Sequence, residues 1–481
     1  MRPTVYVAAA LGLASPICVV ATDPLTADKV EADITTTGLQ RVLWNLNKIA
    51  RDHGGNRAFG TPGYKASVDF VLERAQQRFG KEMDTHLHPF SYWFEDLRRI
   101  KVTGPAGEDV RVLSPQYNVA GDIKNTPLVD TPVDDANGSG CLPEQWTGID
   151  ATGKLALIKR GTCAVSQKLA LAKQHGAVGA IVWNNRPGDA IISLTLGAEN
   201  RGTIVPVGII TQEVGLAWKA RLAAGEQVLV SLLVDNSYDV RESWNVISET
   251  KEGDPNKVVM IGAHLDSVIQ GAGTNDDGSG SSAVLEIMGS IKKYKGFPHK
   301  IRFAWWGAEE SGLIGSKAYT KSLNTTQADA IRYYFNYDMI GSVNPMYELA
   351  RNKLSGIGPV LLSSYLESKG KPVTYADFDD GSDYASFVAL GIPTASIYTG
   401  EDPCYHQACD TIDNIDWDAL TTNAKAAGRA LATLALSLDG VPPRAPPAAR
   451  RNLADVSGPS RRAAMSPPRG AVGRQGRRFG V

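Results

Sequence analysis

The sequence predicts an α/β fold built on a mixed but largely parallel β-sheet with helices on both faces. Between residues 239 and 440, short apolar runs with the length of buried strands alternate with segments of helical periodicity, such as SAVLEIMGSIKKY and PVLLSSYLESKG. Acidic or histidine side chains follow four of these runs (VVMIGA, IRFAWW, YYFNY and TASIY). The carboxyl ends of parallel strands are where α/β proteins place ligands, so the same alternation also predicts a functional site.

The first residues have the pattern of a secretory signal. Arg2 supplies a positive charge, residues 5–20 are apolar apart from Pro16, and the small Ala21 offers a cleavage site. No other segment has the roughly 20 apolar residues that a membrane-spanning helix requires. We therefore expect residues 1–21 to be removed and the protein to be secreted, or delivered to a vacuolar or lysosomal lumen.

Residues 36–111 are expected to form the first part of the α/β domain. Apolar residues recur at helical spacing in 39–49 and again in 68–75, which predicts two helices. The glycine-containing segment NRAFGTPGY separates them.

Residues 112–238 differ in character from the sequence on either side. They contain the short β-rich runs KLALIKRG, GAIVWNN, VPVGIIT and QVLVSLLVD, with one helical segment that ends at Gly176. We expect a separate β-rich domain here. It divides the α/β domain into two pieces, residues 36–111 and 239–440.

Residues 441–481 differ again. This segment has nine arginines and a single acidic residue, Asp455, which gives it a net charge of plus eight. A chain rich in proline and arginine with few large apolar residues cannot bury a core, so we expect a disordered tail. A cleaved or functionless extension explains this composition better than an anionic partner does.

Five side chains in the second half of the chain are candidate metal ligands: His264, Asp276, Glu310, Asp338 and His406. Taken singly, each has a structural explanation, because an Asp beside Gly commonly caps a turn and a lone His commonly makes a hydrogen bond. Together, two imidazoles and three carboxylates form a nitrogen and oxygen ligand set that suits zinc, with one carboxylate able to bridge two ions.

The surrounding segments HLDSV, NDDGSG, EES, YDMIGS and CYHQACD occur in the order found in a known family. They resemble the secreted di-zinc aminopeptidases of the M28 type. The β-rich segment 153–185 resembles a protease-associated domain, a module inserted into exported peptidases. The resemblance implies a zinc-exopeptidase fold with this module inserted, and the module either narrows the approach of substrate or is a passive surface domain.

The resemblance also assigns the metal ligands. Asp276 would bridge two zinc ions. His264 and Asp338 would complete the protein ligands of one ion, and Glu310 and His406 those of the other. Zinc lowers the pKa of a bound water and polarises a carbonyl, which suits peptide hydrolysis.

Further roles follow from neighbouring residues. The resemblance makes Glu309 the base that takes a proton from the attacking water and delivers it to the leaving amine, and Tyr405 the hydrogen-bond donor to the tetrahedral intermediate. Asp266, two residues after His264, is a candidate for orienting that imidazole. The pair Asp276-Asp277 resembles a site that holds a cis peptide bond in relatives.

One segment departs from the family pattern. GSDYASF contains Asp383, but Tyr384 stands where many single-domain relatives have His. The role of Asp383 is therefore left open.

The cysteines predict two disulfides. Cys18 lies in the signal segment, which leaves four cysteines in an oxidising compartment. Proximity favours Cys141 with Cys163 and Cys404 with Cys409. Alternatively, Cys404, His406 and Cys409 would form a thiolate zinc site; export argues against this, and the resemblance implies a disulfide that pins the His406 loop. Asn137 and Asn324 begin N-glycosylation sequons.

The motifs exclude two other classes of hydrolase. The chain has neither the G-x-S-x-G of many serine hydrolases nor the H-E-x-x-H of another large metalloprotease class. The resemblance implies an aminopeptidase with two zinc ions per chain and a preference for Leu or other bulky apolar residues. A carboxypeptidase, a glutaminyl cyclase and an inactive receptor-like protein are the alternatives, and retention of all ligands together with Glu309 argues against the last. We expect peptide substrates, no nucleic-acid or membrane partner, and a monomer.

Overall fold

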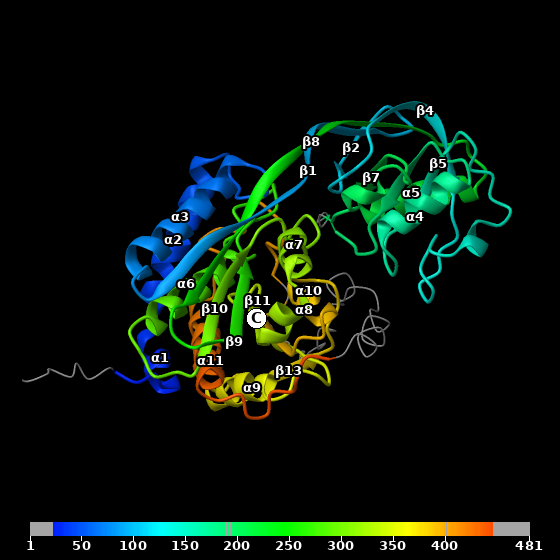
Figure 1. Ribbon diagram of the computed structural model, residues 1–481. Helices are drawn as coiled ribbons and strands as arrows, with labels where there is room; N and C mark the ends of the chain where they lie inside the picture. The colour runs from blue at the N-terminus through cyan, green and yellow to red at the C-terminus, as the bar shows by residue number, and fades with distance from the viewer. Residues whose placement is uncertain (1–22, 189–190, 192–193, 401, 446–481) are drawn as a thin grey trace, which may run out of the picture.

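The computed structural model describes residues 23–188, 191, 194–400 and 402–445. It contains a helix-flanked α/β body and a smaller β-rich domain, joined by a long two-stranded ribbon (Figure 1). The expected signal segment 1–21 and residues 446–481 of the expected tail lie outside the described residues. Across the described residues, no helix combines the length and apolar character needed to cross a bilayer.

The body is built on a mixed sheet whose central strands are parallel. Within one 14-stranded sheet of the described residues, β9 pairs in parallel with β10 and β11, and β11 pairs in parallel with β14. The apolar runs predicted as strands are therefore confirmed. The body strands are β9 (Asp254–His264), β10 (His299–Trp306), β11 (Ile331–Tyr337), β12 (Tyr347–Ala350), β13 (Val373–Ala376) and β14 (Thr394–Tyr398).

The sequence of β9 reflects its position at the centre of the sheet. Residues 258–264 are all buried, because helices cover both faces. A strand buried on both faces has a continuous apolar run rather than alternation, which is why VVMIGA could be recognised. The sequence did not predict the short strands β12 and β13 at the edge of the sheet.

Helices pack on both faces of this sheet, as predicted (Figure 1). The larger core includes side chains of α2, α3, α6 and α11, and the opposite face is covered by α7 and α10. The two helices predicted from periodicity are α2 and α3, each capped by a threonine side chain that accepts a backbone N–H. The body helices are α1 (Ala27–Asp33), α2 (Thr36–Asp52), α3 (Pro62–Phe79), α6 (Gly278–Ile291), α7 (Ile314–Ser322), α8 (Thr325–Ala330), α9 (Gly358–Ser368), α10 (Tyr384–Ala389) and α11 (Trp417–Leu436).

The ribbon consists of two long antiparallel strands, β1 (Met83–Thr103) and β8 (Leu229–Thr250). One end of β8 pairs with β10 in the body, and the other end pairs with β4 in the β-rich domain. The domain limit expected at 238/239 therefore falls inside a continuous strand. The β-rich run QVLVSLLVD indicated a strand at the start of β8 but not its continuation into the body.

The β-rich domain contains a small sheet with helices on it. The predicted helix is α4, which ends at Gln174 and is followed by Gly176 in the left-handed region, with φ of 83°. The remaining elements are β2 (Asp109–Val110), β3 (Val112–Leu113), β4 (Gly121–Asp130), β5 (Leu155–Lys159), β6 (Gly179–Trp183), β7 (Val207–Ile210), α4 (Val165–Gln174), α5 (Gln212–Ala223) and the short 3-10 helices Pro143–Trp146 and Ala198–Asn200.

The first residues of the expected tail contact the body, which corrects the start of the tail predicted at residue 441. Arg444 forms an ion pair with Asp329 and donates to the Leu390 carbonyl. The Ala445 N–H donates to the Gly391 carbonyl, and Ala445 is buried. Val441 also packs against the large apolar core of the body, so residues 441–445 attach through one guanidinium and two small apolar side chains.

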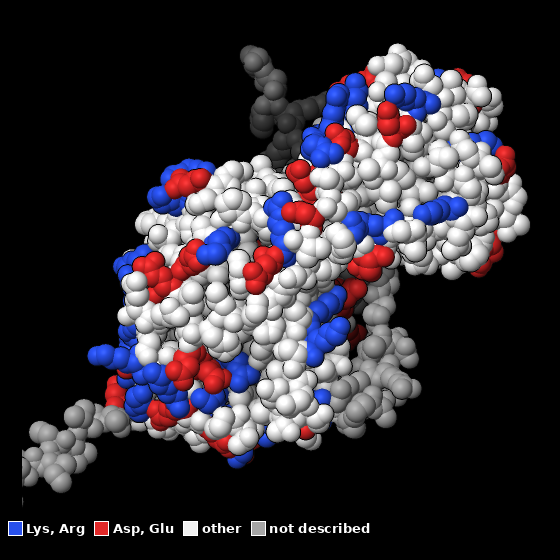
Figure 2. Space-filling view, turned by 45° about the horizontal axis from the view of Figure 1, so that its top comes forward, with Lys and Arg blue, Asp and Glu red and all other residues white. Residues whose placement is uncertain are grey.

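Charges of both signs are interspersed over the face of the molecule shown in Figure 2. Nucleic-acid binding relies on clustered Lys and Arg that neutralise phosphates. Among the residues that the structure describes, this face presents no extended basic surface of that kind.

Candidate active site

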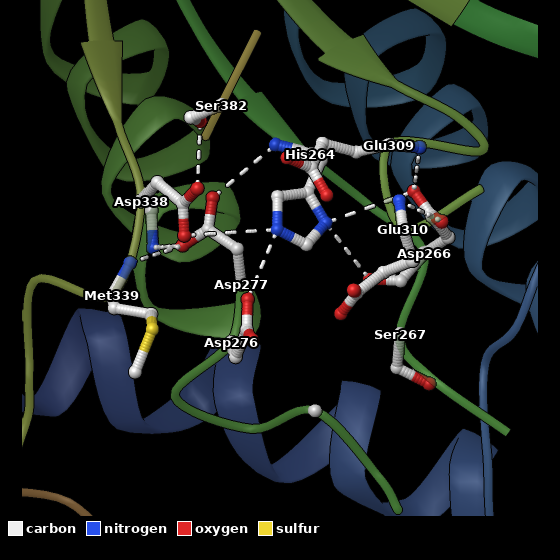
Figure 3. A network of polar contacts seen from close by, with 12 residues as sticks. His264, Asp266, Ser267, Asp276, Asp277, Glu309, Glu310, Asp338, Met339 and Ser382 are labelled. Atoms are coloured by element: carbon white, nitrogen blue, oxygen red, sulfur yellow. Dashed lines mark hydrogen bonds and ion pairs between the residues drawn. The ribbon is translucent and has the colours of Figure 1, made fainter. Parts of the chain in front are cut away.

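All five predicted ligands and Glu309 meet in one buried site at the carboxyl edge of the parallel strands. His264 is the last residue of β9, Glu309 and Glu310 lie in the loop after β10, and Asp338 directly follows β11. Two longer loops contribute the remaining side chains, Asp276 before α6 and His406 after β14. Figure 3 shows the side chains that surround His264.

Asp276 lies between the two imidazoles. Its Oδ1 is 3.1 Å from Nε2 of His264, and its Oδ2 is 3.3 Å from Nε2 of His406. Each carboxylate oxygen thus faces a different histidine. This is the arrangement expected of a bridging carboxylate.

The other two predicted ligands divide between the histidines. His406 Nε2 is 3.0 Å from Oε2 of Glu310, and His264 Nε2 is 3.7 Å from Oδ1 of Asp338. Ligand atoms of His264, Asp276 and Glu310 all lie within 4.8 Å of one another, and so do those of His264, Glu309 and Asp338. Distance alone therefore leaves Glu309 close enough to act as a ligand.

The donor set fits divalent zinc. Within the described part of the chain, Oδ2 of Asp276 and Oε1 of Glu310 make no hydrogen bond although both atoms are buried. Buried carboxylate oxygens require a cation or a hydrogen bond to offset desolvation. Nitrogen and oxygen donors converging at this spacing are the ligands that zinc binds in hydrolases.

The carboxylates strongly affect the two imidazoles. Burial would lower the pKa of His406, but the negative charges of Glu310 and Asp276 raise it to about 10. Burial also opposes protonation of His264, yet Glu309 and the neighbouring aspartates raise its pKa well above the usual range. The site therefore attracts positive charge, and metal ions would replace these protons.

Asp266 connects the ends of two strands. Its Oδ1 accepts the N–H of Glu309 at 3.1 Å and its Oδ2 accepts the N–H of Glu310 at 3.3 Å (Figure 3). His264 Nδ1 lies 3.1 Å from the backbone carbonyl of Asp266 and 3.7 Å from its Oδ1. Asp266 thus lies beside the imidazole as expected, and it also holds the backbone of both glutamates.

Asp410 is a site residue that the sequence analysis did not single out. Its carboxylate is buried and accepts the N–H of Asn275 at 2.8 Å and that of Asp276 at 3.0 Å. It ends the quoted motif CYHQACD, so the motif was the available signal. Asp410 joins the His406 loop to the backbone of Asp276.

The peptide bond between Asp276 and Asp277 is cis, as predicted. Asp277 then caps α6, because its Oδ1 accepts the N–H of Gly280 at 2.8 Å. Its Oδ2 accepts the N–H of His264 at 3.2 Å. The helix cap therefore also contacts the strand that carries a candidate ligand.

Arg57 gives the segment NRAFGTPGY a role that the sequence did not reveal. Its side chain is fully buried and donates to carbonyls of the loop 265–273, including Ala272 at 3.0 Å and Gly273 at 2.6 Å. This loop leads from His264 towards Asp276. Arg57 therefore fixes the path of the chain between two candidate ligands.

The segments of Tyr405 and Asp383 contact different candidate ligands. The Tyr405 ring stacks on His406 with 3.8 Å between ring centroids. Asp383 is buried, and burial raises its pKa to about 7. Its segment reaches the ligands through Ser382, whose hydroxyl donates to Oδ2 of Asp338 at 2.7 Å. Tyr384 instead donates to Asp379.

Both predicted disulfides are present. Cys141 is bonded to Cys163, and Cys404 is bonded to Cys409. The second disulfide closes the loop that carries His406, so the alternative thiolate zinc site at Cys404 and Cys409 is wrong.

The chain is similar to known peptidases over most of its length. Residues 245–431 match the model of peptidase family M28, and residues 124–218 match that of the PA domain. An aminopeptidase of Pseudomonas aeruginosa is 35% identical over 82% of this chain and 80% of its own length. Leucine aminopeptidase 2 of Arthroderma otae is 31% identical over 87% of this chain and 88% of its own. A solved zinc aminopeptidase from Bacillus subtilis, BSAP, is 25% identical with a TM-score of 0.62, covering 85% of this chain and 96% of that one.

Proposed function

Because the chain belongs to peptidase family M28 and is a zinc-dependent aminopeptidase, we propose that it is a secreted enzyme that uses two zinc ions and Glu309 to release N-terminal residues from peptides. The N-terminal signal pattern and the two disulfides support export, since disulfides persist in oxidising compartments.

The observation that carries the proposal is the placement of Asp276 between His264 and His406. Asp276 would be shared by the two ions; His264 and Asp338 would help to hold one of them, and Glu310 and His406 the other. When bound, the two zinc ions lower the pKa of water and polarise the scissile carbonyl.

Glu309 is the general base of this proposal. It is buried beside His264 and Asp338, while its neighbour Glu310 faces His406. Its carboxylate takes a proton from the attacking water and delivers it to the leaving amine. The family resemblance supports this order, because distance alone does not separate a base from a ligand here.

Two further side chains support the reaction. Tyr405 donates a hydrogen bond to the oxyanion of the tetrahedral intermediate, and its stacking on His406 supports this position at the site. Asp266 holds Glu309 and Glu310 through their backbone N–H groups, so it sets the direction of both side chains.

The proposed substrates are peptides with a free N-terminus and an apolar first residue, Leu in particular. Relatives named leucine aminopeptidase support this preference. The PA domain, carried on the β1 and β8 ribbon, is proposed to narrow the approach of the rest of the peptide.

The proposal is tested with a panel of chromogenic aminoacyl amides and their N-acetylated counterparts. We expect release to be fastest with the Leu amide and to be abolished by acetylation, because the enzyme requires the free amine. Metal analysis of the same preparation should find two zinc ions per chain. Equal turnover of acetylated substrates, or full activity with one ion per chain, would contradict the proposal.

A further inference from the structure

The PA domain contains a buried lysine that the proposed reaction does not use. Lys168 lies on α4 and its side chain is fully buried. Its Nζ donates to the Ser139 carbonyl and lies 3.3 Å from Sγ of Cys141. The amine therefore contacts one sulfur of the Cys141–Cys163 disulfide.

Lys168 is positively charged although no carboxylate pairs with it among the described residues. Among the described residues, no acidic side chain forms an ion pair with Lys168. Burial lowers its pKa to about 8, so the ammonium form predominates at neutral pH. A buried charge that lacks an acidic partner is costly to folding, and an apolar side chain of similar length would avoid that cost.

The two sulfurs of the disulfide have different surroundings. Cys141 is buried, with 3% of its surface exposed, and Lys168 lies against it. Cys163 is partly exposed, and both of its neighbours, Thr162 and Ala164, are exposed. The Cys163 side of the disulfide is therefore the more exposed one, while the positive charge lies on the Cys141 side.

We propose that the Cys141–Cys163 disulfide is a thiol-exchange site, at which a small thiol attacks Cys163 and Lys168 stabilises the departing thiolate of Cys141. In the first step the external thiolate forms a bond to Sγ of Cys163, the disulfide bond breaks, and its electron pair passes to Sγ of Cys141. A second external thiolate then attacks the sulfur of the bound small molecule and frees Cys163. Overall, two thiols are oxidised to their disulfide while the protein disulfide gains two electrons.

The ammonium acts on both the rate and the equilibrium of this exchange. A thiolate beside a positive charge has a lower pKa and leaves faster. The same contact stabilises the reduced protein, and stabilisation of the reduced form makes a disulfide easier to reduce. The second disulfide, Cys404–Cys409, has no lysine contact of this kind among the described residues, so it provides an internal comparison.

The test compares the full-length chain with its Lys168→Met variant in a series of reduced and oxidised glutathione buffers. After alkylation of free thiols, peptide mass spectrometry reports the reduced fraction of each disulfide. We expect Lys168→Met to make Cys141–Cys163 at least tenfold harder to reduce, a change of about 30 mV for a two-electron couple. Reduction of Cys404–Cys409 should not change.

Lys173→Met is the matched control, since Lys173 lies on the same helix but its amine is exposed and donates to the Gly202 carbonyl. This variant should leave both disulfides unchanged. Unaltered aminopeptidase activity of both variants would show that they are folded.

A second measurement needs no variant. Acid-trapped mixed disulfides of the natural chain should carry glutathione on Cys163. Glutathione on Cys141, or a shift of less than about twofold in Lys168→Met, would overturn the proposal.

Discussion

The Asp266 carboxylate accepts the backbone N–H of Glu309 at 3.1 Å, and its second oxygen binds the next N–H, that of Glu310. Asp266 follows β9 and the glutamates follow β10, so this contact fixes the relative position of two strand ends. Both glutamates lie in a bend and turn, which is closed by the N–H groups of Gly312 and Leu313 donating to the Glu309 carbonyl. Because one carboxylate holds both N–H groups, Asp266 fixes the backbone from which the two glutamate side chains leave.

Replacing Asp266 with Asn tests this contact. The amide keeps one acceptor oxygen but places an NH2 group against the other backbone N–H, so one of the two hydrogen bonds is lost. We expect zinc affinity to fall by roughly 10- to 100-fold, as for other residues that orient ligands, with a parallel loss of kcat at limiting zinc. Titration with a competing chelator measures the affinity. The exposed Asp96→Asn is the matched control, and equal zinc affinity in both variants would argue against a positioning role.

Replacing Asp410 with Asn should affect both zinc ions, because Asp410 holds the backbone of Asn275 and of Asp276, the proposed bridging ligand. His406→Ala, by comparison, removes a proposed ligand of one ion only. We therefore expect weaker binding of both ions in Asp410→Asn and of one ion in His406→Ala. Stepwise zinc titration followed by calorimetry distinguishes the two patterns. Loss of a single ion in Asp410→Asn would contradict the shared role.

Much of the catalytic domain could be predicted because its central strands are buried on both faces. Such strands have continuous apolar runs, and polar residues directly after them marked His264, Glu310 and Asp338. The contacts of Arg57 and Asp410 could not be predicted, because their partners lie far away in sequence and many are backbone groups. Because every residue type has the same backbone N–H and carbonyl groups (proline lacks the N–H), a backbone partner cannot be recognised from the amino-acid sequence.

The continuity of the ribbon was missed for a related reason. The apolar run in β8 ends near residue 234, and polar side chains follow it over the bridge between the two domains. Pairing with β1, rather than burial, keeps this part extended. The pattern of apolar residues along the sequence reflects burial, so it does not predict a strand that is held by pairing alone.

The tail offers a test of where the folded body ends. A chain that ends at Ala445 should keep the melting temperature of the full chain, whereas one that ends at Asp439 should melt lower. The shorter chain loses the Arg444–Asp329 ion pair and the backbone contact of Ala445 with Gly391. Because Asp329 is exposed, that ion pair contributes about 1 kcal/mol or less to stability. Thermal unfolding of both chains checks this, and identical melting temperatures would mean that residues 440–445 contribute nothing.

The buried Lys168 predicts an unusual pH dependence of stability. Its pKa is about 8 in the folded protein and 10.5 when unfolded, so between these values the unfolded state binds more protons. Stability due to this group should therefore rise from pH 8 to 10.5, by about 3 kcal/mol. Below pH 8 the full penalty for burying the charge remains. Urea unfolding of the natural chain and of Lys168→Met at pH 7 and 9.5 should show the difference between them shrinking at the higher pH, and a constant difference would contradict the assignment.

Exchanging each glutamate for glutamine separates the two proposed roles of Glu309 and Glu310. Glu309→Gln keeps the size and the polar atoms but removes the basic carboxylate, so both zinc ions should stay bound while kcat falls by roughly 10² to 10⁴. The Michaelis constant should change much less, because the base acts in the chemical step. Glu310→Gln should instead lose zinc, since its carboxylate faces His406 at 3.0 Å and an amide is a poorer ligand.

Zinc content and kcat, measured on the same preparations of both variants, decide between the assignments. The two residues share one loop and one Asp266 anchor, so a general disturbance of that loop would alter both variants alike. Loss of zinc from Glu309→Gln, with both ions kept in Glu310→Gln, would require the base and the ligand to be exchanged. Both residues lie close enough to the histidines for either role, and only the separate responses of metal binding and turnover tell a ligand from a proton carrier.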